Sequence, residues 1–117
     1  LVVEDQEQVR AMVCRMLRMR GYNTLEAAHG EEAQQVAGDY DGPIHLLLTD
    51  MIMTGMNGRE LSLLLAKQRP GIKTLFMSGY AADALGRQGA YSGEMRFIQK
   101  PFTANDLAHK AREALDN

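Results

Sequence analysis

Short apolar runs alternate with longer amphipathic stretches along the whole chain. The apolar runs predict strands at residues 1–4, 22–27, 44–49, 74–78 and 96–99. The stretches that follow them predict helices at residues 7–20, 31–37, 59–68, 81–87 and 105–115. Strands that alternate with helices are typical of a parallel sheet covered by crossover helices. We therefore predict an α/β fold, a doubly wound parallel sheet built from five strand–helix units.

Three local patterns refine this prediction. The third apolar run, "IHLLL", is almost continuous, which is typical of an interior strand covered on both faces. The fourth helix is interrupted or followed by glycines at 86, 89 and 93, and an interior glycine costs about 1 kcal/mol of helix stability. We therefore expect a short fourth helix followed by a loop. Thr103 and Asp106, three residues apart, predict the start of the last helix.

Length and charge restrict the class of protein. The 117 residues predict a single domain at 1–117, and 45% hydrophobic with 24% charged residues is ordinary for a globular chain. The formal net charge of −2 argues against a nucleic-acid partner, which usually requires clustered excess Lys and Arg. Arginines do cluster in the first predicted helix, but they alternate with apolar residues, so we interpret them as its solvated face.

The cysteine and hydropathy patterns point to a compartment. Cys14 is the only cysteine, so no disulfide can form within the chain. No apolar run approaches the roughly 20 residues that span a bilayer. We therefore predict a cytoplasmic location and no membrane contact by this domain.

Polar side chains of chemically reactive types lie at the ends of four predicted strands. Glu4 and Asp5 follow the first strand, Asp50 the third, Ser78 the fourth and Lys100 the fifth. The carboxyl ends of parallel strands meet at one edge of the sheet, where ligands bind. Each residue also has an ordinary alternative: Asp5 could cap the first helix, and Asp50 could belong to a surface turn. Their joint position favours one functional cluster.

The charge of this cluster predicts a metal ion and a phosphoryl group. Three carboxylates and the Lys100 ammonium carry a net charge of −2, which one divalent cation would neutralise. Oxygen donors favour Mg²⁺ or Mn²⁺ over zinc, and we expect His29, His45 and His109 not to be ligands because they are scattered. A carboxylate can act as a nucleophile towards phosphorus, and phosphoryl transfer requires mainly positioning and charge neutralisation.

Four segments carry a resemblance to a known family. "LVVED", "LLLTDMIMTGMNG", "FMSGY" and "FIQKPF" occur in this order, and together they resemble the receiver domain of two-component response regulators over essentially the whole chain. The resemblance implies a flavodoxin-like (βα)5 fold with strand order 2-1-3-4-5. The segment "LFMSGYA" is most similar to the C-terminal receivers of hybrid sensor histidine kinases.

The resemblance also implies the acceptor and the metal ligands. Asp50 matches the phosphoacceptor of the family. Asp5 matches the direct magnesium ligand, and Glu4 matches the acidic partner that usually acts through water. Ile52 matches the position whose backbone carbonyl completes the metal shell.

The same comparison assigns the remaining roles. Lys100 matches the lysine that contacts the phosphate, and Ser78 matches the switch hydroxyl. Phe97 matches the switch aromatic, and because it lacks the tyrosine hydroxyl its switching would depend on packing alone. The bond between Lys100 and Pro101 is a candidate for the cis form.

These roles imply phosphorelay signalling. A phosphohistidine on a histidine kinase or a histidine phosphotransfer protein would supply the phosphoryl group to Asp50. The domain would promote its own phosphorylation and dephosphorylation without being a conventional enzyme, and the face of its fourth helix, fifth strand and fifth helix would change its affinity for a partner.

Three alternatives remain open from the sequence. The first is a degenerate receiver that acts only as a protein-binding module. The second is an Asp-nucleophile phosphatase, which usually carries a second Asp where this chain has Ile52. The third is a flavin-binding domain, although no Ser/Thr/Gly-rich loop follows the first strand.

Overall fold

The computed structural model describes residues 1–53, 55–79 and 96–116. The predicted fourth helix at 81–87 and the glycines at 86, 89 and 93 lie outside this part of the chain. Along the chain the described elements are β1 (Val2–Val3), α1 (Glu7–Met19), β2 (Glu26–Ala27), α2 (Gly30–Asp39), β3 (Leu46–Asp50), α3 (Gly58–Gln68), β4 (Lys73–Ser78), β5 (Phe97–Gln99) and α5 (Ala104–Asp116).

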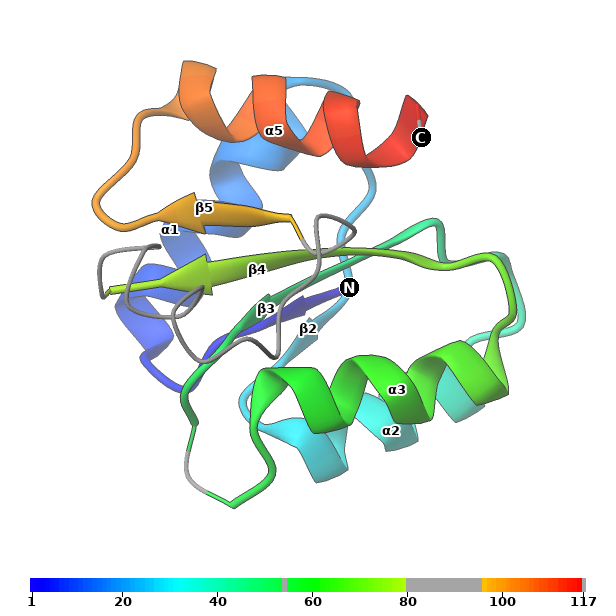
Figure 1. Ribbon diagram of the computed structural model, residues 1–117. Coiled ribbons are helices and arrows are strands. Elements are labelled where there is room, and N and C mark those ends of the chain that lie inside the picture. Colours follow the sequence, from blue (N-terminus) through cyan, green and yellow to red (C-terminus); the bar gives the residue numbers. More distant parts are fainter. Residues whose placement is uncertain (54, 80–95, 117) are drawn as a thin grey trace.

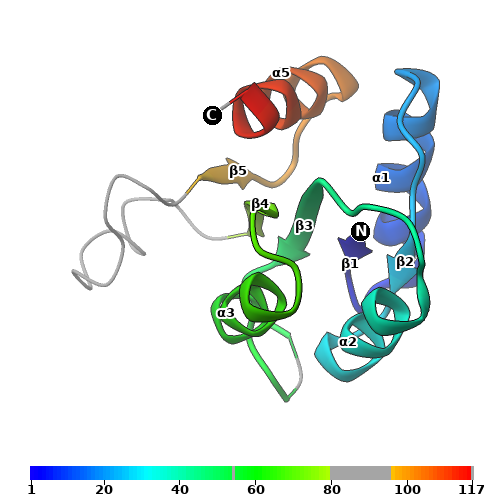
Figure 2. The same ribbon diagram turned by 90° about the vertical axis from the view of Figure 1, so that its right-hand side faces the viewer.

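The five strands form one parallel sheet in the order β2-β1-β3-β4-β5. Helices α1 and α5 lie on one face, and α2 and α3 lie on the other (Figures 1 and 2). This arrangement confirms the predicted doubly wound α/β fold and its strand order. The predicted interior position of the third strand is also confirmed, because β3 lies between β1 and β4.

Alternate residues of the central strands supply a separate core to each face, as the period of two in a strand requires. On the α2 and α3 face, Val3 and Leu47 pack with Leu61 and Leu65. On the α1 and α5 face, the buried cluster consists of Val2, Val13, Cys14, Leu17, Leu48, Leu75, Met77, Ile98, Leu107 and Ala111. The two cores hold the sheet from both sides and fix the direction of its strand ends.

The first two strands are shorter than predicted. Residues 22–25 do not form the first part of β2, because Tyr22 donates its backbone N–H to the carbonyl of Leu17 and closes the end of α1. The backbone N–H of Val2 still donates to the Leu25 carbonyl at 2.8 Å, so the chain runs beside β1 before regular pairing begins. An apolar pattern cannot separate such a connecting segment from the strand that follows it.

Helix starts show which polar residues have a structural role. Asn57 and Glu60 form a reciprocal capping box at α3, and the predicted cap of α5 is confirmed by mutual hydrogen bonds between Thr103 and Asp106. His29 caps α2, because its Nδ1 atom accepts a hydrogen bond from the Glu32 backbone N–H. Nothing in the sequence pattern indicated this histidine cap.

The first helix is not capped by Asp5. Its N-cap residue is Gln6, whose side chain makes no capping hydrogen bond. The capping alternative for Asp5 was therefore wrong, and the Asp5 carboxylate is left at the end of β1.

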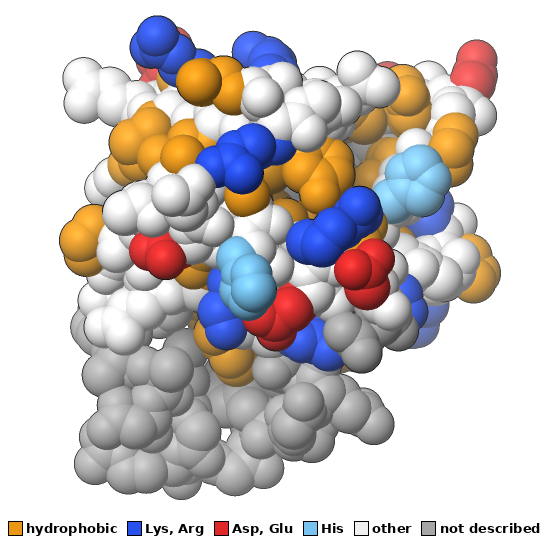
Figure 3. Space-filling model, turned by 90° about the horizontal axis from the view of Figure 1, so that it is seen from above, with side chains coloured by type: hydrophobic (Ala, Val, Ile, Leu, Met, Phe, Trp, Pro, Cys, Tyr) orange, Lys and Arg blue, Asp and Glu red, His pale blue; other side chains and the backbone are white. Residues whose placement is uncertain are grey.

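The outer surface of α1 and α5 mixes charged and hydrophobic side chains, as the space-filling view of this side shows (Figure 3). The predicted solvated arginine face is confirmed for Arg15, Arg18 and Arg20, which are exposed, but not for Arg10, which is half-buried. Arg18 pairs with Glu26 of β2 at 3.2 Å. Within the described ranges, no helix has the length and apolar character needed to cross a bilayer.

Candidate functional site

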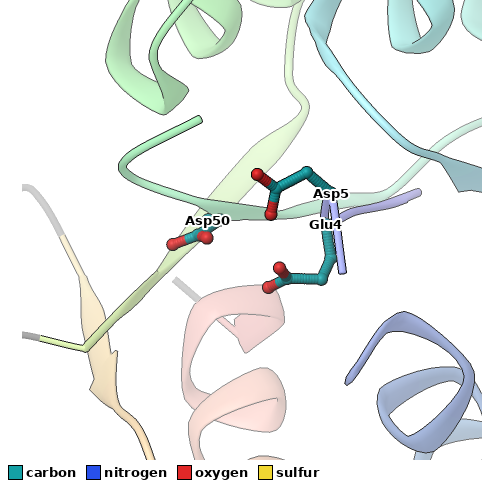
Figure 4. A group of neighbouring side chains, drawn as sticks. All are labelled: Glu4, Asp5 and Asp50. Carbon is teal, nitrogen blue, oxygen red and sulfur yellow. The ribbon is translucent and has the colours of Figure 1, made fainter. Parts of the chain in front are cut away.

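The fold brings the predicted site residues to one edge of the sheet. Glu4 follows β1, Asp50 ends β3, Ser78 ends β4 and Lys100 follows β5. In Figure 4 the carboxylates of Glu4 and Asp5 lie beside that of Asp50. Strand register explains why these residues are close together, because neighbouring parallel strands end side by side. Asp50 at the end of β3, for example, lies opposite Met77 of β4.

Glu4 is the most enclosed charge of the site. Its side chain is fully buried, and its two carboxylate oxygens accept hydrogen bonds from different donors. Oε2 lies 2.7 Å from the Lys100 ammonium, and Oε1 lies 3.2 Å from the backbone N–H of Gln6. A buried carboxylate requires such partners to offset its lost hydration.

Asp50 shares the same lysine at a longer distance. Its Oδ2 atom lies 3.4 Å from Nζ of Lys100. Asp50 lines a hollow of about 250 Å³ together with Ile52, Ser78, Gly79 and Lys100. The hollow is large enough for a small anion group and faces the carboxylate.

Burial raises the pKa of both Glu4 and Asp50 above the ordinary carboxyl range. A hydrogen bond from Lys100 opposes this shift at both residues. At Asp50 the charge of Lys100 and a backbone hydrogen bond from Ile52 also oppose it. Burial also favours the neutral form of Lys100, but its contacts with the two carboxylates outweigh burial and raise the pKa of Lys100. The lysine is therefore charged at neutral pH.

The acidic cluster has the composition and spacing of a cation site. One carboxylate oxygen from each of Glu4, Asp5 and Asp50 lies within 4.8 Å of the others. Carboxylate oxygens suit a hard divalent cation such as Mg²⁺. Asp5 is exposed, so its carboxylate can exchange hydrating water for a bound cation with less rearrangement than the carboxylate of the buried Glu4. The residues present therefore fit a bound Mg²⁺ ion.

The predicted fourth ligand, the carbonyl of Ile52, lies in the loop after β3. The Ile52 residue is 54% exposed, and its backbone N–H is directed to Asp50. Participation of its carbonyl in a metal shell stays a prediction.

Ser78 ends β4, and Phe97 begins β5, the neighbouring strand at the edge of the sheet. Ser78 is buried and lines both the hollow at Asp50 and a larger hollow of about 370 Å³ that Phe97 also lines. The Phe97 ring packs on Phe76 with 5.5 Å between ring centroids and an interplanar angle of 33°. The two predicted switch residues therefore line one common hollow. The bond between Lys100 and Pro101 is cis, as the resemblance implies.

Arg10 contributes to the structure around the site, although its sequence pattern indicated only a solvated helix face. Its Nη1 atom donates to the Glu4 backbone carbonyl at 2.9 Å, and its Nε atom lies 3.4 Å from Oε1 of Glu26. Arg10 therefore ties α1 to the ends of β1 and β2. A half-buried arginine four residues into a helix carries no sequence signal for such a contact.

Comparison with known sequences gives a consistent group of relatives. The sequence matches the response regulator receiver domain family over residues 1–112. It is 38% identical over 116 residues to the sensor kinase CckA of Brucella abortus (strain 2308), which covers 99% of this chain but 12% of that protein. It is 30% identical over 115 residues to the response regulator receiver protein CpdR of the same organism, with 98% of this chain and 94% of that protein covered.

Solved structures show the same architecture. The crystal structure of the receiver domain from the hybrid histidine kinase CckA aligns with a TM-score of 0.74 and 36% identity, covering 97% of this chain and 95% of that chain. A CheY-like response regulator receiver domain protein from Methanospirillum hungatei JF-1 aligns with a TM-score of 0.80 and 28% identity, covering 98% and 90% of the two chains.

Proposed function

Because the chain belongs to the response regulator receiver domain family, we propose that Asp50 accepts a phosphoryl group from a phosphohistidine on a partner protein. An oxygen of the Asp50 carboxylate bonds to phosphorus as the bond between phosphorus and the imidazole nitrogen breaks. The electron pair of the broken bond stays on that nitrogen. The observation that carries the proposal is the hollow beside Asp50, which Lys100 and Ser78 also line.

The other site residues have distinct parts in this proposal. Lys100 places a positive charge 3.4 Å from Asp50 and can contact an incoming phosphoryl oxygen. Ser78 offers a hydroxyl at the end of the neighbouring strand, and Phe97 responds through its packing on Phe76.

Glu4, Asp5 and Asp50 would hold Mg²⁺, with the Ile52 carbonyl as a further ligand. When bound, Mg²⁺ supplies positive charge that neutralises the phosphoryl oxygens.

Labelling with a small phosphodonor tests the proposal. The protein is incubated with acetyl phosphate and Mg²⁺, and its intact mass is measured. We expect a mass increase of one phosphoryl group that is lost in Asp50→Asn and in the presence of a chelator. Asp41→Asn, at an exposed acidic residue between α2 and β3, is the matched control and should label normally. An unchanged wild-type mass would support the degenerate-receiver alternative.

The physiological donor is a second part of the proposal. Identity to the CckA sensor kinase and to the receiver of a hybrid histidine kinase supports a donor that is a histidine kinase or a histidine phosphotransfer protein. This chain spans 12% of that sensor kinase, so attachment to a kinase core is itself proposed. Transfer of label from a phosphorylated kinase domain to wild-type protein, but not to Asp50→Asn, tests the donor class. A cytoplasmic location follows from such a donor and stays a prediction.

A further inference from the structure

Gly58, the first residue of α3, lies against the main chain of Asp50. An ideal Cβ atom built on Gly58 would lie 2.4 Å from the carbonyl oxygen of Asp50 and 3.0 Å from Cα of Met51. Both neighbours are backbone atoms, which cannot rotate aside as the end of a flexible side chain does. A side chain at this position would require the gap to open by about 1 Å to reach ordinary van der Waals contact.

The Asp50 side of this contact is held in place. The Thr49 hydroxyl donates to the Asp50 carbonyl at 3.0 Å, and Thr49 is fully buried. The next residue, Met51, donates its backbone N–H to the Met77 carbonyl of β4 at 2.9 Å. The end of β3 is therefore fixed to the neighbouring strand and cannot withdraw without breaking these bonds.

The Gly58 side is also held. Its backbone N–H donates to the Met51 carbonyl at 2.9 Å, which closes the loop that begins at Asp50. The capping box of Asn57 and Glu60, with hydrogen bonds of 2.8 and 3.2 Å, fixes the first turn of α3 around it. An added side chain must therefore displace either α3 or the peptide group of Asp50.

We propose that Gly58 is a positioning residue for the phosphoacceptor. Its missing side chain allows α3 to contact the Asp50 peptide, and this contact fixes the Asp50 carboxylate relative to Asp5 and Lys100. The inference rests on the proposed function, since it concerns the same carboxylate. Misplacing a reacting group by about 1 Å can cost on the order of a hundredfold in rate, so the contact bears directly on phosphoryl transfer.

The first residue of α2 supplies a matched comparison. Gly30 is also buried and also begins a helix, but the three atoms nearest to a Cβ there all belong to the side chain of Met56, with the sulfur at 2.9 Å and the Met56 Cβ at 3.2 Å. The sulfur can rotate away, and the Cβ contact requires a shift of only a few tenths of an ångström. Gly38, exposed near the end of α2, has only the end of the Gln68 side chain within 3.4 Å. Alanine should be accepted at both positions.

The test compares Gly58→Ala and the bulkier Gly58→Val with Gly30→Ala and Gly38→Ala. All proteins are studied at a temperature where circular dichroism shows them fully folded, so that lost stability does not affect the readouts. In Gly58→Ala we expect Mg²⁺ affinity to fall at least about threefold and the acetyl phosphate labelling rate to fall about tenfold or more. The backbone amide NMR signals of Asp50 and Met51 should shift. Gly58→Val should show larger effects, and both control variants should stay within about twofold of wild type.

Normal Mg²⁺ affinity, labelling and amide signals in a folded Gly58→Ala variant would overturn the inference. If both Gly58 variants fail to fold, hydrogen exchange of the wild-type Gly58 amide decides: added Mg²⁺ should slow its exchange at least about threefold, and unchanged exchange overturns the inference. A wild-type protein that does not label would instead refute the proposed function, and the Asp50 and Met51 amide signals of Gly58→Ala would still decide the role of Gly58.

Discussion

The ammonium group of Lys100 lies 2.7 Å from Oε2 of Glu4 and forms the shortest ion pair of the described site. The two residues are 96 positions apart in the chain and meet because β1 and β5 both end at the same edge of the sheet. Glu4 is fully buried, whereas the Lys100 side chain is 23% exposed. The lysine is therefore both the charge partner of Glu4 and the group that faces Asp50.

Removing the lysine should leave Glu4 as an uncompensated buried charge. We expect Lys100→Met to lower the free energy of unfolding by about 3 kcal/mol at pH 8 in metal-free buffer. The loss should shrink at pH 5, because the pKa of Glu4 is already raised by burial and rises further without the ammonium, so the folded protein takes up a proton instead. Urea unfolding at the two pH values measures both effects.

Two further variants check this interpretation. Lys67→Met, at an exposed lysine of α3, should change stability by no more than about 0.5 kcal/mol. In Glu4→Gln with Lys100→Met the total loss should be smaller than in Lys100→Met alone, because the buried charge is gone. Equal losses at pH 5 and pH 8 would contradict the prediction.

The raised pKa of Asp50 predicts how metal and pH act on stability. A carboxyl group whose pKa is higher in the folded protein stabilises the fold below its unfolded pKa, and this contribution is lost as pH rises through the folded pKa. In metal-free protein the contribution of Asp50 to stability should therefore fall as pH rises from about 4, and Mg²⁺ should restore more stability at pH 7.5 than at pH 5. Thermal unfolding with a chelator and with Mg²⁺ measures this difference.

Asp50→Asn should distinguish the effect of the Asp50 charge on stability from the effect of the bound metal ion. In metal-free buffer at neutral pH the variant should be more stable than wild type, because a half-buried carboxylate whose pKa is raised by burial is removed from the acidic cluster. Its gain on adding Mg²⁺ should be much smaller than that of wild type. Asp41→Asn is the control, and an equal Mg²⁺ gain in Asp50→Asn would exclude Asp50 from the metal site.

The sequence predicted those parts of the fold that local pattern determines. Periodicity located the described strands and helices, and the residues at the strand ends identified the acidic cluster because a parallel sheet gathers those ends. The start of β2 was misplaced, since an apolar run cannot show that Tyr22 completes the hydrogen bonding of α1.

The missed parts depend on distances between segments. His29 was expected not to be a metal ligand, and its sequence position did not indicate that its ring nitrogen caps α2. Arg10 was treated as part of a solvated face, and its contact with the Glu4 carbonyl exists only once α1 packs beside β1. Nothing in the sequence pattern distinguished Gly58, and only the folded chain shows the Asp50 carbonyl beside it.

Cys14 should be unreactive in the folded protein. Its side chain lies in the core between the sheet and α1, it is 0% exposed, and burial raises the pKa of its thiol. Both the lack of access and the scarcity of thiolate oppose attack on a disulfide reagent. We expect negligible reaction with Ellman's reagent at pH 8 under native conditions, and one thiol per chain after unfolding in guanidinium chloride. Rapid stoichiometric labelling of native protein would show that this part of the core opens readily.

Arg10 should influence metal binding although it touches no metal ligand side chain. Its hydrogen bond to the Glu4 carbonyl and its ion pair with Glu26 hold the end of β1, from which the Asp5 carboxylate extends. We expect Arg10→Ala to lower the free energy of unfolding by about 1–2 kcal/mol and to weaken Mg²⁺ binding by about threefold or more, as measured by titration calorimetry well below the unfolding temperature.

Arg10→Lys separates charge from geometry. A single ammonium cannot reach both acceptors as a planar guanidinium does, so this variant should keep the charge but recover only part of the Mg²⁺ affinity. Arg15→Ala, at an exposed arginine of the same helix, should bind Mg²⁺ like wild type and controls for lost positive charge near the acidic cluster. If Arg10→Ala loses stability while its Mg²⁺ affinity stays unchanged, Arg10 supports the fold alone, and the position of Asp5 depends on the sheet and not on α1.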